Sequence, residues 1–356
     1  MDMAWAALTA AAGTILGLKC IKPIALRLGL VDKPCARKQH DGHIPLVGGI
    51  SVFVGVLFTS MLWLPESRQF NLYLIASAIM VFIGALDDRH NLSVRVRLVG
   101  QVLVASIMIF GAGIYIKDLG NLFGFGSVNL GWFGIPFTYL AVLGAINAYN
   151  MIDGIDGLVG TLSVITLSFL ATLFLLADGN SHAGYLSFIV VIAILPFLFF
   201  NLFGKPNDGR LRKIFMGDAG SMFIGFTVVW LLAEGCQGAN PVFQPVLALW
   251  IIAVPLMDMA SVMIRRWRKG QSPFIADRDH LHHIFMRAGF SASEALIFIS
   301  CIAAVLAIVG TWLNFVNVPS WMSLFIFMGV FSVYSATLQR AWTFSKWLRM
   351  RRKLEE

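Results

Sequence analysis

The sequence is poor in charge: Asp, Glu, Lys and Arg make up 13% of its 356 residues, roughly half the share of an ordinary soluble domain. Hydrophobic residues make up 58%, and the mean hydropathy is +0.78. So few charged side chains cannot cover a surface of this size with water-binding groups. The composition excludes a soluble or disordered protein and predicts an integral membrane protein.

Cysteine is also scarce, and its four positions, Cys20, Cys35, Cys236 and Cys301, show no paired spacing. The sequence therefore predicts neither a disulfide framework nor a cysteine zinc site. It also has no internal repeat, no low-complexity tract and no linker long enough to separate two domains. Residues 1–356 are accordingly expected to form a single domain.

Long apolar runs are abundant, and each is long enough to cross a hydrocarbon core about 30 Å thick as a helix. They predict an all-α polytopic membrane bundle of about 11 transmembrane helices. The expected spans are 3–19, 45–64, 70–86, 98–116, 132–150, 158–177, 183–203, 219–234, 244–262, 293–312 and 320–340.

The positions of the positive charges predict the orientation, because Lys and Arg in short loops are retained on the cytoplasmic side. With the N-terminus outside, all 27 Lys and Arg except Arg68 and Lys117 lie in cytoplasmic segments. We therefore expect an N-out, C-in protein, and we attribute the net charge of +8 to topology and not to nucleic-acid binding. The longest outer loop, 117–131, is expected to form a hairpin at the interface.

Acidic residues gather at the predicted cytoplasmic ends of three helices. They are Asp87 and Asp88, Asp153 and Asp156, and Asp218. Carboxylates beside hydrocarbon are costly unless they are solvated or bound to something. Single loop aspartates are common, but three acidic loops on one side of a membrane favour a shared site.

Asp87 and Asp88 are adjacent and are followed by Arg89, Arg95 and Arg97. Neighbouring carboxylates repel each other and favour a shared cation or a shared proton. The pair is therefore a candidate for binding a hard metal ion or for general-base catalysis, and a purely structural role is the alternative.

The next acidic segment spaces its polar residues by three: Asn147, Asn150, Asp153 and Asp156. In a helical or nearly helical segment, this spacing places them along one side. The glycine after each aspartate allows a ligand to approach the backbone closely. A simple helix end would explain two of these four residues, so we interpret the segment as part of a binding or catalytic site.

Asp218 lies in the segment FMGDAGS, which opens an apolar span. It could cap that helix, whose N-terminal N–H groups also favour phosphate. A pyrophosphate with Mg²⁺ requires only one or two carboxylates and a few other oxygens from the protein. Asp218 is therefore a candidate metal ligand.

The longest cytoplasmic loop, about 263–290, begins with cations suited to membrane anchoring and ends with a histidine cluster. Arg278, His280, His282 and His283 could bind phosphate and sugar hydroxyls, whereas a zinc site and an unbound solvated cluster are the alternatives. Asp258, late in the preceding span, is interpreted as either structural or supportive of the site.

Four motifs carry a family likeness, in chain order: DDRHN at 87–91, NAYNMIDGIDGL at 147–158, FMGDAGS at 215–221 and HLHH at 280–283. LVDKPCARKQHDGHIPLVGGISVF at 30–53 and PLMDM at 255–259 also fit. The chain resembles the polyprenyl-phosphate N-acetylhexosamine-1-phosphate transferases. Within that family it is most similar to the bacterial enzymes that begin O-antigen and enterobacterial common antigen synthesis.

The resemblance implies transfer of GlcNAc 1-phosphate from UDP-GlcNAc to undecaprenyl phosphate, with release of UMP, at the cytoplasmic face of the bacterial inner membrane. Mg²⁺ is the implied cofactor and Mn²⁺ an alternative. A homodimer is an open alternative to a monomer, and GalNAc or another acetamido sugar is an alternative to GlcNAc.

The resemblance also assigns roles to residues. Asn150 and Asp218 match metal-binding positions, and Asp87 and Asp88 match an essential acidic pair. Nucleotide and phosphate contacts are implied, in the same way, for Asp156, Phe215 and Arg97, and Asn147 is grouped with the substrate-binding residues. Leu281 interrupts the three consecutive histidines of the peptidoglycan relative, and Asn91 replaces an acid of some relatives, so Asn91 is given no metal role.

The acidic pair could act as a base, orient the lipid phosphate or attack covalently, and we favour the first two. Two other classes of function compete with the enzyme. A secondary transporter would place functional charges near the bilayer midplane in repeated halves. A lipid-binding scaffold would leave the segment NxxNxxDGxDG without a role.

Overall fold

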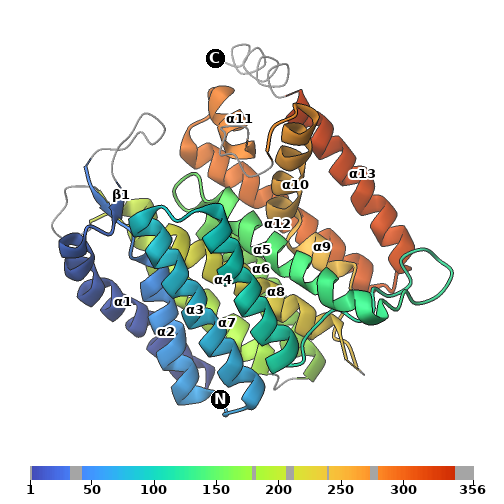
Figure 1. The fold of residues 1–356 in the computed structure, drawn as a ribbon, viewed down its shortest axis with the longest axis horizontal. Coiled ribbons are helices and arrows are strands. Elements are labelled where there is room, and N and C mark those ends of the chain that lie inside the picture. Colours follow the sequence, from blue (N-terminus) through green and yellow to red (C-terminus); the bar gives the residue numbers. More distant parts are fainter. Residues whose placement is uncertain are drawn as a thin grey trace.

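The computed structural model describes residues 2–32, 42–178, 182–205, 212–238, 240–272 and 280–340. These residues form a bundle of helices with one antiparallel pair of short strands, β1 (Val31–Asp32) and β2 (Ile44–Pro45), which confirms the all-α architecture (Figure 1). The α-helices are α1 (Met3–Leu28), α2 (Gly48–Trp63), α3 (Arg68–His90), α4 (Val94–Ser106), α5 (Gly134–Ile152), α6 (Leu158–Asp178), α7 (His182–Phe203), α8 (Gly217–Cys236), α9 (Leu247–Ile251), α10 (Ala253–Arg268), α11 (Leu281–Arg287), α12 (Ala292–Phe315) and α13 (Ser320–Gln339). A π-turn, η1 (Ile107–Gly111), extends α4, and a 3₁₀ turn, η2 (Gly131–Phe133), precedes α5.

Every predicted span contains helix. In the part of the chain that the structure describes, nine helical stretches are long and apolar enough to cross a membrane. The two remaining predicted spans are α2, which has 16 residues, and the segment 244–262, which is divided between α9 and α10.

The prediction of one continuous helix over 244–262 was wrong, and Pro255 supplies a physical reason. Proline has no N–H, and its ring clashes with the carbonyl four residues earlier, which belongs to Ile251. The backbone leaves the helical region at Ile252 (φ −105°, ψ 23°), and Thr166 Oγ1 donates to the Ile251 carbonyl over 3.2 Å. Figure 1 shows α10 rising from this break beside α11 and α13.

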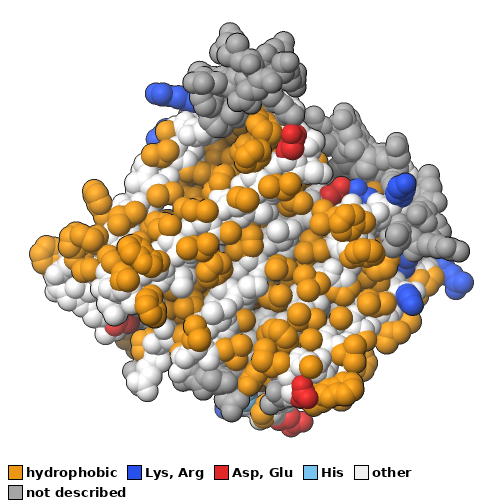
Figure 2. Space-filling view, turned by 180° about the vertical axis from the view of Figure 1, so that it is seen from behind, with side chains coloured by type: hydrophobic (Ala, Val, Ile, Leu, Met, Phe, Trp, Pro, Cys, Tyr) orange, Lys and Arg blue, Asp and Glu red, His pale blue; other side chains and the backbone are white. Residues whose placement is uncertain are grey.

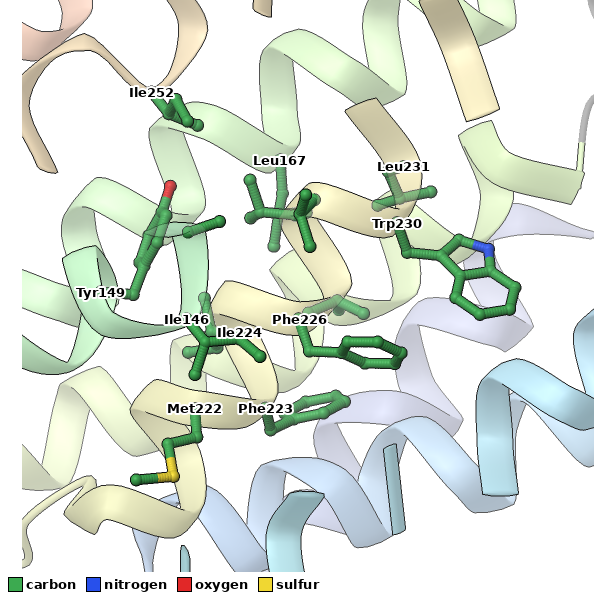
Figure 3. Close-up of a cluster of buried hydrophobic side chains, with 14 of the residues drawn as sticks. Ile146, Tyr149, Leu167, Met222, Phe223, Ile224, Phe226, Trp230, Leu231 and Ile252 are labelled. Carbon is green, nitrogen blue, oxygen red and sulfur yellow. The ribbon is translucent and has the colours of Figure 1, made fainter. Parts of the chain in front are cut away.

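The centre of the bundle is α8. In its most apolar stretch of 18 residues, 94% of the residues are buried, whereas the corresponding share is 22% in α12 and in α13. Small residues let neighbouring backbones touch it. A Cβ atom on Gly49 of α2 would lie 2.1 Å from Gly220 Cα, and one on Gly84 of α3 would lie 2.4 Å from Ala219 Cα. Figure 3 shows the aromatic side chains of α8, Phe223, Phe226 and Trp230, pointing away from Ile146 and Tyr149 of α5. Their rings contact Phe53 of α2 and Tyr73 of α3. The N-terminus of α8 is thereby fixed against α2 and α3.

The outer surface of the bundle is largely apolar, and Figure 2 shows charged side chains mainly toward the margins of one face. Large hydrophobic side chains of α12 and α13 are exposed, among them Ile308, Trp312, Phe315, Phe325 and Val333. Soluble monomers rarely expose contiguous apolar surface of this extent. These helices are therefore suited to contact lipid.

The loop predicted as a hairpin has that form. Asp118 bridges Asn129 in antiparallel fashion, and Leu119 N–H donates to the Val128 carbonyl over 3.0 Å. The side chain of Gln237, at the end of α8, accepts from the backbone N–H groups at the start of the loop. The hairpin is thus attached to the end of α8 opposite Asp218.

Candidate active site

Asp87 and Arg97, both predicted site residues, form an ion pair where α3 turns into α4. The helix α3 ends at Asn91, which adopts a left-handed conformation with φ 49°. Asp87 is 4% exposed; its Oδ1 accepts from Leu92 N–H over 2.7 Å, and its Oδ2 accepts from the Arg97 guanidinium over 3.1 Å. Asp87 therefore holds the Arg97 guanidinium in place.

Asp88 caps the N-terminus of α8. Its Oδ1 accepts from Asp218 N–H over 2.8 Å, and its Oδ2 accepts from Ala219 N–H over 3.2 Å. A carboxylate is favourable here because it satisfies free N–H groups at the positive end of the helix dipole. Gly217 has φ 74°, and a Cβ there would lie 2.5 Å from Asp88 Oδ2. The capping role considered for Asp218 is thus filled by Asp88.

The two predicted metal ligands are in direct contact. Asn150 Nδ2, on α5, donates to Asp218 Oδ1 over 2.7 Å and to Ser221 Oγ over 3.0 Å. One turn earlier, Asn147 Nδ2 donates to Gln101 Oε1 of α4 over 2.9 Å. Both asparagines therefore link α5 to neighbouring helices at the same end of the bundle.

The loop after α5 contains the remaining predicted acids and contacts a lysine that the sequence reasoning missed. Asp153 is exposed, whereas Asp156 forms an ion pair with Lys213 over 2.5 Å. The Lys213 ammonium also lies 5.8 Å from the centre of the Phe215 ring. The sequence predicts Lys213 only as a cytoplasmic charge, and its place two residues before Phe215 is the signal that points to the site.

A second missed residue is Asn201, a buried amide on α7. Its Oδ1 accepts from Gly157 N–H over 2.6 Å, and its Nδ2 donates to the Ile214 carbonyl over 2.8 Å. Gly157 has φ 77°, which L side chains rarely adopt. Asn201 thus holds the Asp156 loop and the segment before Phe215 together. A polar residue within an apolar run was the signal.

The histidines of α11 reach the same loop. His282 is buried, and a Cβ on Gly154 would lie 2.1 Å from its Nε2. Burial, with the neighbouring His283 adding to the effect, lowers the pKa of His282 from 6.5 to about 3, so the ring is neutral. The rings of His280 and His282 are parallel within 2°, with centroids 5.8 Å apart. The predicted contact residue Arg278 lies outside the described residues.

The charges around Asp218 are compatible with a magnesium ion. Asp87 and Asp88 both interact electrostatically with Asp218. Within the described ranges, no three His, Cys, Asp or Glu side chains are arranged to enclose a metal ion, so the zinc alternative finds no support there. Mg²⁺ usually takes one or two carboxylates and completes its shell with water and substrate phosphates. The Asp218 carboxylate fits that open type of site, and the side-chain amide of Asn150 lies beside it.

These features define a membrane-embedded helix bundle with carboxylates, amides and cations gathered at one end, a chemistry suited to phosphate groups. The model of glycosyl transferase family 4 matches residues 70–235, which include the acidic loops and α8. Three relatives named undecaprenyl-phosphate α-N-acetylglucosaminyl 1-phosphate transferase align along nearly the whole chain.

The relative from Salmonella typhi is 46% identical over 94% of this chain and 90% of its own length. The relative from Escherichia coli K12 is 44% identical over 96% of this chain and 92% of its own length. The relative from Pasteurella multocida is 42% identical over 96% of this chain and 95% of its own length. This chain belongs to glycosyl transferase family 4.

Proposed function

We propose that the chain transfers GlcNAc 1-phosphate from UDP-GlcNAc to undecaprenyl phosphate, releasing UMP. Relatives that are 42% to 46% identical to this chain are named as undecaprenyl-phosphate α-N-acetylglucosaminyl 1-phosphate transferases. The structural observation that supports it best is the contact of Asp218 with both Asn150 and Asp88, which joins α3, α5 and α8 at one point. The product would begin a lipid-linked glycan.

In this reaction an oxygen of the lipid phosphate attacks the β-phosphorus of UDP-GlcNAc. The bond from that phosphorus to the bridging oxygen breaks, and UMP leaves with the oxygen. The attack requires the two phosphates, both anionic, to be held close together and in line. Arg97, after α3, and Lys213, five residues before Asp218, provide the cations for this.

Asp218 and Asn150 would hold Mg²⁺, or Mn²⁺ by the same oxygen ligands, and the ion would neutralise pyrophosphate charge. Phe215 would stack on the uracil and Asp156 would contact the nucleotide. The Lys213 ammonium contacts both of these side chains. Binding of the nucleotide would therefore break the Lys213–Asp156 ion pair or change its geometry.

The contacts of the acidic pair favour an orienting role over covalent attack. A phosphate monoester has a second pKa near 6, so the lipid phosphate is largely dianionic at neutral pH and gains little from a base. Both oxygens of Asp88 accept N–H groups of α8, and both oxygens of Asp87 accept hydrogen bonds. Asp88 would fix the start of α8, and Asp87 would fix Arg97.

We place this site at the cytoplasmic face of a bacterial inner membrane, because the segments predicted on the same side of the membrane as its loops hold all 27 Lys and Arg except Arg68 and Lys117. The lipid phosphate would enter from the bilayer between helices.

Detergent-purified protein, Mg²⁺, undecaprenyl phosphate and sugar-labelled UDP-GlcNAc would test the proposal. The expected result is label in the lipid extract with equimolar UMP, both lost on chelation and restored by Mg²⁺. Release of UDP would indicate a glycosyltransferase acting at the sugar carbon, and binding of lipid without turnover would indicate a scaffold. Either result would overturn the proposal.

A further inference from the structure

Asp258 is a buried carboxylate outside the acidic loops, and it joins three helices. It lies on α10 and is 1% exposed. Its Oδ2 is 2.6 Å from His280 Nδ1, and its Oδ1 accepts from Leu281 N–H over 2.9 Å and from Tyr334 O–H of α13 over 3.0 Å. The Leu281 N–H and the Tyr334 O–H thus both donate to one oxygen of this carboxylate, and the His280 imidazole contacts the other.

Burying a carboxylate is costly, so a role in packing alone would be served as well by an apolar side chain. A carboxylate supplies something that an apolar or amide side chain does not: it accepts at both oxygens. His280 Nδ1 must therefore carry the proton, and the tautomer of the imidazole is fixed. Its other nitrogen, Nε2, then carries a lone pair and can accept a hydrogen bond.

His280 is connected to the acidic loops through ring contacts. Its ring is parallel to that of His282, and His282 Nε2 packs against Gly154 in the Asp156 loop. A rotation of His280 would therefore disturb a segment that carries predicted substrate-binding residues.

We infer that Asp258 is a positioning residue: it holds His280 in the Nδ1-protonated form, with Nε2 available to the substrate. This inference rests on the proposed transfer reaction. Asp258 acts through His280 and not by touching the reacting phosphates.

The kinetic test is a double-mutant cycle. D258N replaces one accepting oxygen with an NH₂ donor, which opposes the Nδ1 proton and favours the wrong tautomer. We expect kcat to fall about 10- to 100-fold, as for other residues that orient a functional histidine. Y334F removes only the α13 contact and should reduce kcat less than about threefold. Y73F, which removes the buried Tyr73–Thr227 hydrogen bond between α3 and α8, is the control for loss of a tyrosine contact.

H280A should lower kcat to a similar extent, and D258N in the H280A background should cause little additional loss, because residues that act through one another are not additive. Two results would overturn the inference: the same fold loss from D258N in both backgrounds, or a loss in Y334F equal to that in D258N. Monodispersity and thermal unfolding of each variant would identify any that fail to fold.

A substrate-free test separates this inference from the proposed function. In protein with ¹⁵N-labelled imidazoles, the His280 signals, assigned with H280Q, should show the Nδ1-protonated tautomer in the wild type and its loss in D258N. An Nε2-protonated ring in the wild type would contradict the inference whatever the substrate. Wild-type protein that gives the expected tautomer but no lipid product would contradict the transfer reaction alone.

Discussion

Asn150 Nδ2 lies 2.7 Å from Asp218 Oδ1 and so joins the end of α5 to the first turn of α8. If this pair holds the metal ion, D218N should reduce kcat at least about 10²- to 10³-fold, the scale of losing a preorganised charge at a reacting phosphate. The fold should persist, because Asp88 accepts from the backbone N–H of residue 218 and not from its side chain. The measurement is turnover together with thermal unfolding.

D118N is the matched control, since Asp118 is also a hydrogen-bonded acid but lies in the hairpin at the far end of α8. Its activity should match that of the wild type. Normal turnover in D218N would refute the metal assignment.

Lys213 contacts both Asp156 and the Phe215 ring, which links a cation to the two predicted nucleotide-binding residues. K213M should raise the KM for the nucleotide sugar about tenfold, equivalent to about 1.4 kcal/mol of binding, with a smaller change in kcat. Initial rates over a range of nucleotide-sugar concentrations would measure this. K205M is the control, because Lys205 is an exposed lysine near the site. Its backbone forms a β-bridge with Arg212, the residue before Lys213. Equal KM values in the two variants would remove Lys213 from the site.

Gly154 is the point at which His282 meets the acidic loop. G154A would place a methyl group 2.1 Å from His282 Nε2, so the ring or the loop must move. We expect kcat/KM to fall by about 10²-fold, because small displacements of positioning groups have effects of that order. G144A, in α5 just before this loop, meets only the end of the Met259 side chain, at 3.9 Å, and should remain active. Comparable activity of the two variants would show that the contact is unimportant for turnover.

The burial of neutral His282 makes stability depend on pH. Its folded pKa of about 3 lies below the ordinary 6.5, so the unfolded chain takes up a proton first as pH falls. The stabilisation is complete above pH 6.5 and is lost between about pH 6.5 and 3, by at most about 1.4 kcal/mol per pH unit. The melting temperature should therefore fall less between pH 7 and pH 5 in H282Q than in the wild type.

H182Q, which changes an exposed histidine, is the control for that experiment and should keep the wild-type dependence. A wild-type slope in H282Q would mean that His282 is protonated, or exposed, in the folded protein.

The sequence predicted the helices and the acidic loops well, because apolar length and clustered carboxylates are local signals. Asp88 and Asn150 were predicted site residues, but their contacts with Asp218 were not, since they join positions 130 and 68 residues apart. Contacts of that separation depend on how α3, α5 and α8 pack, which spacing along the chain does not encode.

The residues that were missed had weaker signals. Pro255 lies in an apolar run whose average hydropathy conceals the break before α10. Asn201 is a single amide in α7, and its role emerges only from its two backbone contacts, with Gly157 and Ile214. Lys213 is one of several cations in its cytoplasmic segment, and the positive-inside rule alone accounts for them, so its contact with Asp156 has no separate signal in the sequence.

A phosphosugar transferase moves the β-phosphorus of UDP-GlcNAc to the lipid together with the sugar, and the fate of that atom distinguishes it from an enzyme that moves the sugar alone. UDP-GlcNAc labelled with ³²P at the β-position would be incubated with the purified protein, Mg²⁺ and undecaprenyl phosphate. We expect ³²P to enter the lipid and the released nucleotide to be unlabelled UMP. Recovery of the ³²P in UDP, with the sugar alone on the lipid, would contradict it.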